Sequence, residues 1–240
     1  MLAEPQKYIR AAGLIFVLTF LCAPVSRGAV VVFDRVTTVG TPVYLKVLTK
    51  GLLFSQGGRR VEIYLDQKKL KQILTGGDGY GYLKYTPLRA GFKRIEARAD
   101  GDNASGLMLV MDKRDQAIVI EVEGAFQTSF LSKEEREAGR KAVETLKADY
   151  QIIYLSRYLG AGLLKRWLEK ENFPESALLP WQGPEMLAAL QAKGVKLHAM
   201  IASPALLSAA ADHIERRYTF EETEDGQKVK DWDEILKLLK

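Results

Sequence analysis

The stretch Gln116–Ala125, QAIVIEVEGA, divides the chain into two parts with different hydrophobic patterns. It begins with a run of apolar and β-branched residues and ends on two glutamates and a glycine. From here to the C-terminus, apolar runs of about four to seven residues alternate with amphipathic helical patterns. Such alternation predicts a parallel sheet with helices on both faces. We therefore expect one Rossmann-like α/β domain over residues 115–240.

Individual elements of this domain follow from their patterns. The expected strands are AIVIEV (117–122), QIIYLS (151–156), ALLPW (177–181), KLHAMIA (196–202) and RYTFEE (217–222). The expected helices run from a capping box of Ser132 and Glu135 to about Ala148, over Ala161–Glu171, from Pro184 to Lys193-Gly194, from about Pro204, and over Trp232–Leu239. Strands and helices therefore follow one another in regular order.

The upstream part has an all-β pattern. Between Ala29 and Asp112, short alternating runs are separated by Gly, Pro and Asp residues that are typical of turns. The expected strands are VYLKVL (43–48), VEIYLD (61–66), GYLKYTPL (81–88), KRIEARA (93–99) and GLMLVMD (106–112). Strand-like runs without a helical period predict an antiparallel β sandwich over residues 29–112.

A family resemblance covers much of this upstream part. Its second half contains a turn pattern T-x-x-D-G, followed by Y-T-P, A-G and a strand with alternating Ile and Ala. The residues that carry the pattern are Thr75, Asp78, Gly79, Tyr85-Thr86-Pro87, Ala90-Gly91, Ile95 and Ala97. This resembles the bacterial immunoglobulin-like domains of secreted and surface proteins. The resemblance implies an all-β immunoglobulin-like sandwich.

The N-terminus has the order of a secretory signal peptide. A polar segment with Lys7 and Arg10 precedes the uncharged apolar run 11–25, and small residues stand before a cleavage position after Gly28. We expect residues 1–28 to be a signal peptide and the protein to be extracytoplasmic, periplasmic or secreted. The alternative, an uncleaved membrane anchor, is less favoured because a spanning helix needs about 20 residues.

Composition excludes several kinds of site. The 240 residues include one cysteine, Cys22, and two histidines, His198 and His213. A disulfide scaffold, a thiolate cluster and a multi-histidine metal centre are therefore excluded. The single cysteine leaves with the signal peptide, if that peptide is cleaved.

The net charge of +5 is divided unevenly. Residues 29–114 carry a net +7 and residues 115–240 a net −4. A solvated basic face is the simpler interpretation of the sandwich. The alternative is a surface for an anionic lipid or polysaccharide, or for a protein partner. No nucleic-acid partner is expected, because no recognition motif is present.

A second resemblance lies in the stretch that opened this section. QAIVIEVEGA is similar to the first motif of haloacid dehalogenase (HAD)-like phosphatases, a buried strand that runs into Asp-x-Asp-Gly-Thr. Glu121 and Glu123 occupy the two aspartate positions, and Gly124 is retained. Ser156, in YQIIYLSR, occupies the hydroxyl position of the second motif, in a segment that resembles the lipin-type phosphatidate phosphatases. The resemblance implies a nucleophile, an acid/base and a Mg²⁺ ion at these positions.

The chain departs from the HAD pattern at each remaining motif. The third motif requires a lysine early in a helix, where this chain has Gln182-Gly183-Pro184-Glu185; Lys193 and Lys196 lie at the far end of that helix. The fourth requires two acids, where Ala202 and Leu206 stand. Each glutamate also extends its carboxylate by one methylene, and a misplacement of about 1 Å can lower a rate about a hundredfold.

These departures favour a degenerate site with no intact catalytic residue. We expect an exported binding or scaffolding protein without a cofactor, whose degenerate site positions are Glu121, Glu123 and Ser156. The alternative is a weakened or repurposed Mg²⁺-dependent phosphatase for an extracytoplasmic phosphoester such as a lipid phosphate. Only in that case do Glu121 and Glu123 bind metal. The crevice at the strand ends could also bind a phosphorylated ligand without hydrolysing it.

Overall fold

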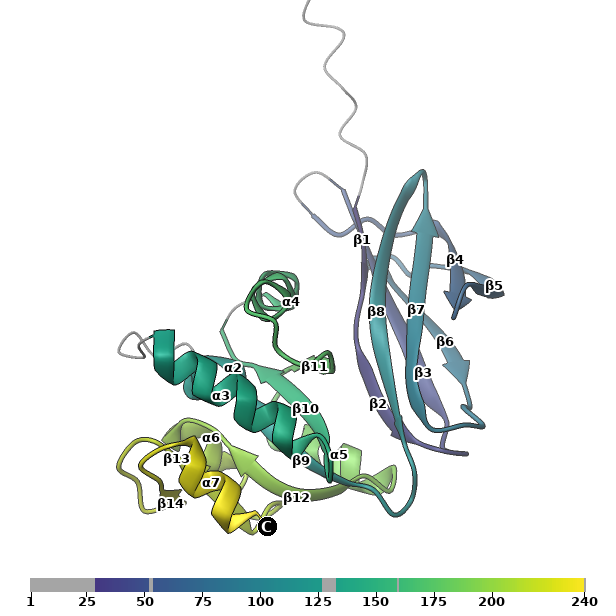
Figure 1. The fold of residues 1–240 in the computed structure, drawn as a ribbon. Helices are drawn as coiled ribbons and strands as arrows, with labels where there is room; N and C mark the ends of the chain where they lie inside the picture. Colours follow the sequence, from purple (N-terminus) through teal and green to yellow (C-terminus); the bar gives the residue numbers. More distant parts are fainter. Residues whose placement is uncertain (1–28, 52–53, 127–132, 159, 240) are drawn as a thin grey trace, which may run out of the picture.

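The fold contains two β-sheet systems side by side, a β sandwich and a helix-covered parallel sheet (Figure 1). The computed structural model describes residues 29–51, 54–126, 133–158 and 160–239. The predicted signal peptide, residues 1–28, and the predicted helix cap at Ser132 lie outside the described residues. Within the described ranges, no helix is long and apolar enough to cross a bilayer.

The sandwich consists of a three-stranded and a five-stranded sheet. In spatial order, the first sheet contains β1 (Ala29–Val32), β3 (Val43–Lys50) and β6 (Tyr80–Tyr85). The second contains β2 (Arg35–Thr38), β8 (Asp102–Met111), β7 (Gly91–Ala99), β4 (Arg60–Leu65) and β5 (Lys68–Leu74). Alternate residues of both sheets face inward and form one apolar cluster, with Leu45, Ile63 and Ile95 fully buried. The predicted β sandwich is confirmed.

Two features of the sandwich differ from the sequence prediction. Its strands pair antiparallel except for β2, which runs parallel to β8 because the chain crosses from one sheet to the other between β1 and β2. The strands β1, β2 and β5 were not predicted. Strand β5, KKLKQIL, is an edge strand exposed along most of its length, so it lacks the alternating apolar face that marks a strand in sequence.

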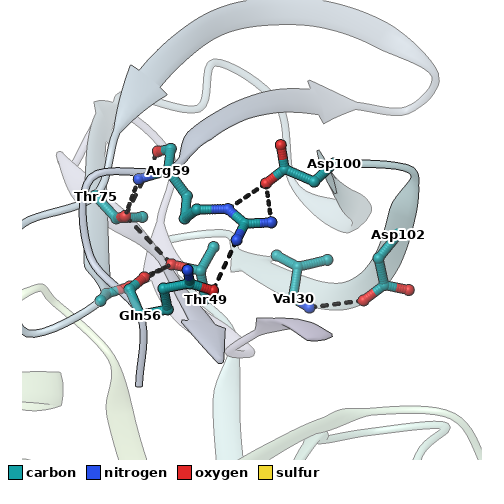
Figure 2. Close-up of polar contacts among 8 residues, drawn as sticks. Val30, Thr49, Gln56, Arg59, Thr75, Asp100 and Asp102 are labelled. Atoms are coloured by element: carbon teal, nitrogen blue, oxygen red, sulfur yellow. Dashed lines mark hydrogen bonds and ion pairs between the residues drawn. The ribbon is translucent and has the colours of Figure 1, made fainter. Parts of the chain in front are cut away.

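A polar cluster ties the two sheets together at one end of the sandwich (Figure 2). The buried hydroxyls of Thr49 and Thr75 lie 3.2 Å apart, and Thr49 also donates to the carbonyl of Gln56. Thr75 accepts a hydrogen bond from the Arg59 backbone N–H, and the Arg59 guanidinium pairs with Asp100. The threonine of the T-x-x-D-G pattern therefore has a structural role, because it satisfies buried backbone groups.

The six-stranded sheet, which lies outside the sandwich, is parallel throughout. Its spatial order is β11 (Ala177–Pro180), β10 (Gln151–Ser156), β9 (Gln116–Glu121), β12 (Lys196–Ile201), β13 (Arg216–Thr219) and β14 (Gln227–Lys228). Numbered along the chain, this order is 3-2-1-4-5-6, the order of doubly wound α/β folds. The predicted parallel sheet is confirmed.

Helices cover both faces of this sheet. One face packs on α2 (Val122–Phe126), α3 (Lys133–Leu146), α4 (Ala161–Lys170) and α7 (Trp232–Leu238), and the other on α5 (Glu185–Ala192) and α6 (Pro204–Ala209). The short elements α2 and β14 were not predicted, since five and two residues are too few to show a period. Strand β13 ends at Thr219, earlier than predicted, and leaves Phe220 and Glu221 outside it.

The sandwich and the parallel sheet share an apolar cluster. Val36 of β2, together with Leu109 and Met111 of β8, packs with residues of β9, β10, α5 and α6. The sandwich therefore covers part of one face of the parallel sheet and lies beside its edge strand β11. The sequence pattern did not predict this shared cluster.

Asp34 is the polar centre of this junction. It lies between β1 and β2 with its carboxylate fully buried. The carboxylate accepts hydrogen bonds from the backbone N–H groups of Leu107 in β8 (2.7 Å) and Leu178 in β11 (2.9 Å). Lys165 of α4 pairs with it at 2.5 Å. A single side chain thus connects both sheets and a helix.

We predict that Asp34→Ala lowers the free energy of unfolding by about 3 kcal/mol, because the partly buried Lys165 ammonium and two backbone N–H donors are left without their acceptor. Urea unfolding of the purified protein measures this loss. The matched control is Asp212→Ala, which removes an exposed carboxylate and should change stability by less than about 0.5 kcal/mol. Equal stability of the two variants would contradict the role assigned to Asp34.

Candidate functional site at the carboxyl end of the parallel sheet

The candidate site lies where the strand order of the parallel sheet reverses. Strands β10 and β11 lie on one side of β9, and β12 and β13 on the other. In open α/β sheets the crevice at the carboxyl ends of strands next to such a reversal is the usual ligand-binding place. The predicted residues Glu121 and Ser156 end β9 and β10, so both lie at this edge.

Glu121 makes its hydrogen bonds on the β12 side of β9. Its Oε2 accepts hydrogen bonds from the Ser203 backbone N–H at 2.7 Å and from the Ser203 hydroxyl at 2.5 Å. Only 1% of Glu121 is exposed. Ser203 follows β12 and stands directly before α6, where its side chain would otherwise cap the helix; no such cap bond forms. The carboxylate therefore connects the ends of β9 and β12.

Glu123 makes its hydrogen bonds on the β10 side of β9. It lies in α2, two residues after the end of β9, and its Oε1 accepts three hydrogen bonds at 3.0–3.2 Å. The donors are the Ser156 hydroxyl and the backbone N–H groups of Arg157 and Tyr158. The structure thus brings the three sequence-predicted residues to one edge, with Ser156 touching Glu123.

Gly124 is needed for close approach rather than for turn geometry. A Cβ at this position would lie 2.6 Å from Glu121 Oε2 and 2.7 Å from the Ser203 nitrogen. Both distances are shorter than any normal contact. The glycine of the motif is therefore required by the hydrogen bond between Glu121 and Ser203.

The other motif positions carry no chemistry at this edge. Ala202 and Leu206, at the positions of the fourth-motif acids, are buried in the apolar cluster beneath α6. Lys196 begins β12 and so lies at the amino end of the sheet, opposite Glu121. Lys193 lies just before it, and its carbonyl accepts a hydrogen bond from Thr38 of the sandwich. Neither lysine can act as a counter-charge near Glu121.

The residues at this edge do not fit a magnesium ion. Mg²⁺ needs several oxygen ligands turned toward one point. Here Glu121 Oε2 is bound to Ser203, beyond β12, and Glu123 Oε1 to residues 156–158, at the end of β10, so these two oxygens are turned toward different partners and not toward one point. The described part of the chain contains no group of three or more Asp, Glu, His or Cys that could hold a metal.

Sequence reasoning missed Ser203 as a partner of Glu121. A serine directly before Pro204 indicates the start of a helix, and it was visible in the sequence. What it could not reveal is that the hydroxyl turns away from the helix and toward the neighbouring strand. That choice depends on β12 lying beside β9.

Comparisons with known proteins identify no family for this chain. No family model matches it, and neither does any curated protein. Similar solved structures include the CARDB domain of a Pyrococcus furiosus protein (19% identity, TM-score 0.28, covering 35% of this chain and 95% of that one). Others are the tandem Ig repeats of Dlar (16%, 0.29, 40% and 58%) and the fibronectin(III)-like modules of Clostridium thermocellum CbhA (13%, 0.27, 36% and 48%). At these scores the likenesses carry no argument about function.

We predict that Ser203→Ala lowers the free energy of unfolding by about 1.5 kcal/mol, because a buried carboxylate loses one of its two donors. Ser208→Ala is the matched control on the same helix, since Ser208 is exposed. Its effect should stay below about 0.5 kcal/mol. Denaturant unfolding measures both variants, and an unchanged Ser203→Ala protein would show that the bond contributes nothing.

A second prediction concerns the glycine. Gly124→Ala should lower the free energy of unfolding by about 1–3 kcal/mol, because the added methyl group displaces Glu121 or Ser203. Gly162→Ala in α4 meets no atom within 4 Å and should raise it by about 0.5–1 kcal/mol through helix propensity. Thermal unfolding measures whether Gly124→Ala lowers the stability and Gly162→Ala raises it. Stabilisation by both substitutions would contradict the close approach.

Proposed function

We propose that the protein is an exported, non-catalytic binding or scaffolding protein, composed of an immunoglobulin-like sandwich and a HAD-type α/β domain whose catalytic site is degenerate. The observation that carries the proposal is the burial and hydrogen bonding of Glu121. Its carboxylate is buried and holds Ser203, so it serves the structure of the sheet edge.

A nucleophile needs access to its substrate and an orientation toward the reacting atom. Glu121 would have to give up both Ser203 contacts and leave a buried position to attack phosphorus. Nor does the fourth motif supply acids, because Ala202 and Leu206 stand there and pack in the core. Developing negative charge at this edge would also meet two carboxylates, which oppose it.

The HAD assignment is supported by the strand order and by the place of the motif residues. A doubly wound sheet of order 3-2-1-4-5-6 is compatible with the Rossmann-like domain that the resemblance implies. Glu121 ends the first strand of this sheet and Ser156 the second. Export is supported by the signal-peptide pattern of residues 1–28.

One observation favours the alternative, a weakened phosphatase for a phosphoester such as a lipid phosphate. The three degenerate positions do meet at one edge, and Ser156 donates to Glu123 at 3.2 Å. The argument against it is the surroundings of both carboxylates, which hold hydrogen-bond donors in place of a cation.

We expect no enzyme-dependent release of phosphate from p-nitrophenyl phosphate or phosphatidate in the presence of Mg²⁺. The purified protein should also show no rise in melting temperature with Mg²⁺, because no ion-binding site forms. Glu121→Gln serves as a matched variant that keeps the size of the side chain. Turnover that Glu121→Gln abolishes would overturn the non-catalytic proposal and establish the phosphatase.

A further inference from the structure

A groove of about 340 Å³ lies between the sandwich and helix α5. Its sandwich wall comes from the crossing between β1 and β2 and from β3, and its other wall from β11 and α5. Charged residues of the groove are Arg35, Lys46, Lys193 and Glu185. Apolar side chains line the floor, among them Val36, Leu179 and Met186. The groove extends from Lys193, near the amino end of the parallel sheet, to Pro180 and Gln182 at its carboxyl end, where Pro180 is paired with Ser156. Glu121, Glu123 and Ser156 themselves do not line it.

Three cations face this groove without an ion pair. Arg35 is held by backbone carbonyls, through Nε to Tyr44 at 2.8 Å and Nη1 to Asp34 at 3.2 Å. Across the described ranges no salt bridge involves Arg35, Lys46 or Lys193. The Asp34 carboxylate is already paired with Lys165. These three cations face one acidic residue of the lining, Glu185, so the groove carries a net positive charge.

The cations are close enough to affect one another. Burial, and after it the charge of Arg35, lowers the pKa of Lys46 and likewise that of Lys193. Asp78, in the turn before β6, offsets this in part at Lys46. Like charges held together in a half-buried place repel, and a bound anion would relieve that repulsion.

An aromatic row continues from the groove onto the outer face of the three-stranded sheet. The ring centroids of Phe33 and Tyr80 lie 6.2 Å apart, and those of Tyr80 and Tyr82 6.4 Å apart. Lys46 lies over the row, with Nζ 4.2 Å from the Tyr80 centroid and 4.9 Å from that of Phe33. Tyr82 and Tyr44 are 53% and 57% exposed. Exposed rings in such a row mark an interaction surface.

We propose that this groove and the aromatic row form a binding site for a linear acidic polysaccharide. Its carboxylates meet Arg35, Lys46 and Lys193, and a sugar ring stacks on the exposed Tyr82. The proposal rests on the binding role proposed above and names the class of ligand.

Shape and charge favour this ligand over a membrane. An anionic bilayer presents a broad surface that cannot enter a groove between two sheet systems. A polysaccharide chain is narrow, and its repeated rings and charges correspond to the row of aromatic rings beside the cations. Sugar rings carry C–H groups on their faces, which pack on the electron-rich faces of tyrosine.

The test measures binding of the purified full protein to polygalacturonate by isothermal titration calorimetry. We expect binding that weakens as NaCl rises from about 50 to about 500 mM, because screening reduces charge attraction. Lys46→Ala combined with Lys193→Ala should weaken binding about tenfold or more, and Tyr82→Ala about fivefold. A neutral linear glucan, hydroxyethylcellulose, should bind at least tenfold more weakly than polygalacturonate.

Matched controls separate the groove from general charge and from folding. Lys71→Ala removes an exposed cation of β5 on the other sheet, and Tyr158→Ala removes an exposed ring of the α/β part. Each should change affinity less than twofold. The melting temperature of every variant shows whether it is folded.

Several results would overturn the inference. If Lys71→Ala weakened binding as much as the Lys46→Ala and Lys193→Ala double variant, the attraction would be a general effect of charge. If poly-glutamate bound as tightly as polygalacturonate, sugar stacking on the aromatic rings would have no role. Binding to vesicles of equal parts phosphatidylcholine and phosphatidylglycerol, but not to polygalacturonate, would identify a membrane surface. Absence of binding to every probe refutes this site. It leaves the non-catalytic proposal standing, because that depends on the phosphatase assay.

Discussion

The buried carboxylate of Asp34 is the interaction on which the arrangement of this protein depends. A carboxylate without solvent is unfavourable unless charge and hydrogen bonds compensate it. Here the compensation comes from Leu107 in the sandwich, Leu178 in the parallel sheet and Lys165 in a helix, so it exists only when all three elements are in place. The cost of burying this charge is therefore recovered only in one mutual placement of the two sheet systems.

This placement also determines where the protein can bind. Arg35 follows Asp34 directly, and the strand that starts there packs Val36 into the cluster shared with the parallel sheet. The chain is thereby held with the Arg35 guanidinium toward α5 and beside Lys46 and Lys193. The groove keeps a net positive charge because Asp34 is paired with Lys165 and Glu185 is the one acidic residue of the lining.

The sequence predicted the individual strands and helices better than the packing of the sandwich against the parallel sheet. Runs such as QIIYLS (151–156) are short and apolar enough to form a buried strand, and they form strands at those positions. Strand β5 escaped prediction because an exposed edge strand needs no apolar face. The junction escaped because Asp34 is a single acid in an apolar stretch, and the donors that it meets lie 73 and 144 residues away. The convergence of Glu121 and Ser156 was predictable from strand ends, whereas Ser203 was not.

Glutamate rather than aspartate at position 121 has a structural consequence. One added methylene extends the carboxylate by about 1.5 Å. That reach brings the oxygen to Ser203, beyond the end of the neighbouring strand. Gly124 leaves the space in which the two groups meet. The longer side chain therefore makes a contact across the reversal of the sheet. In that position the carboxylate connects the ends of β9 and β12.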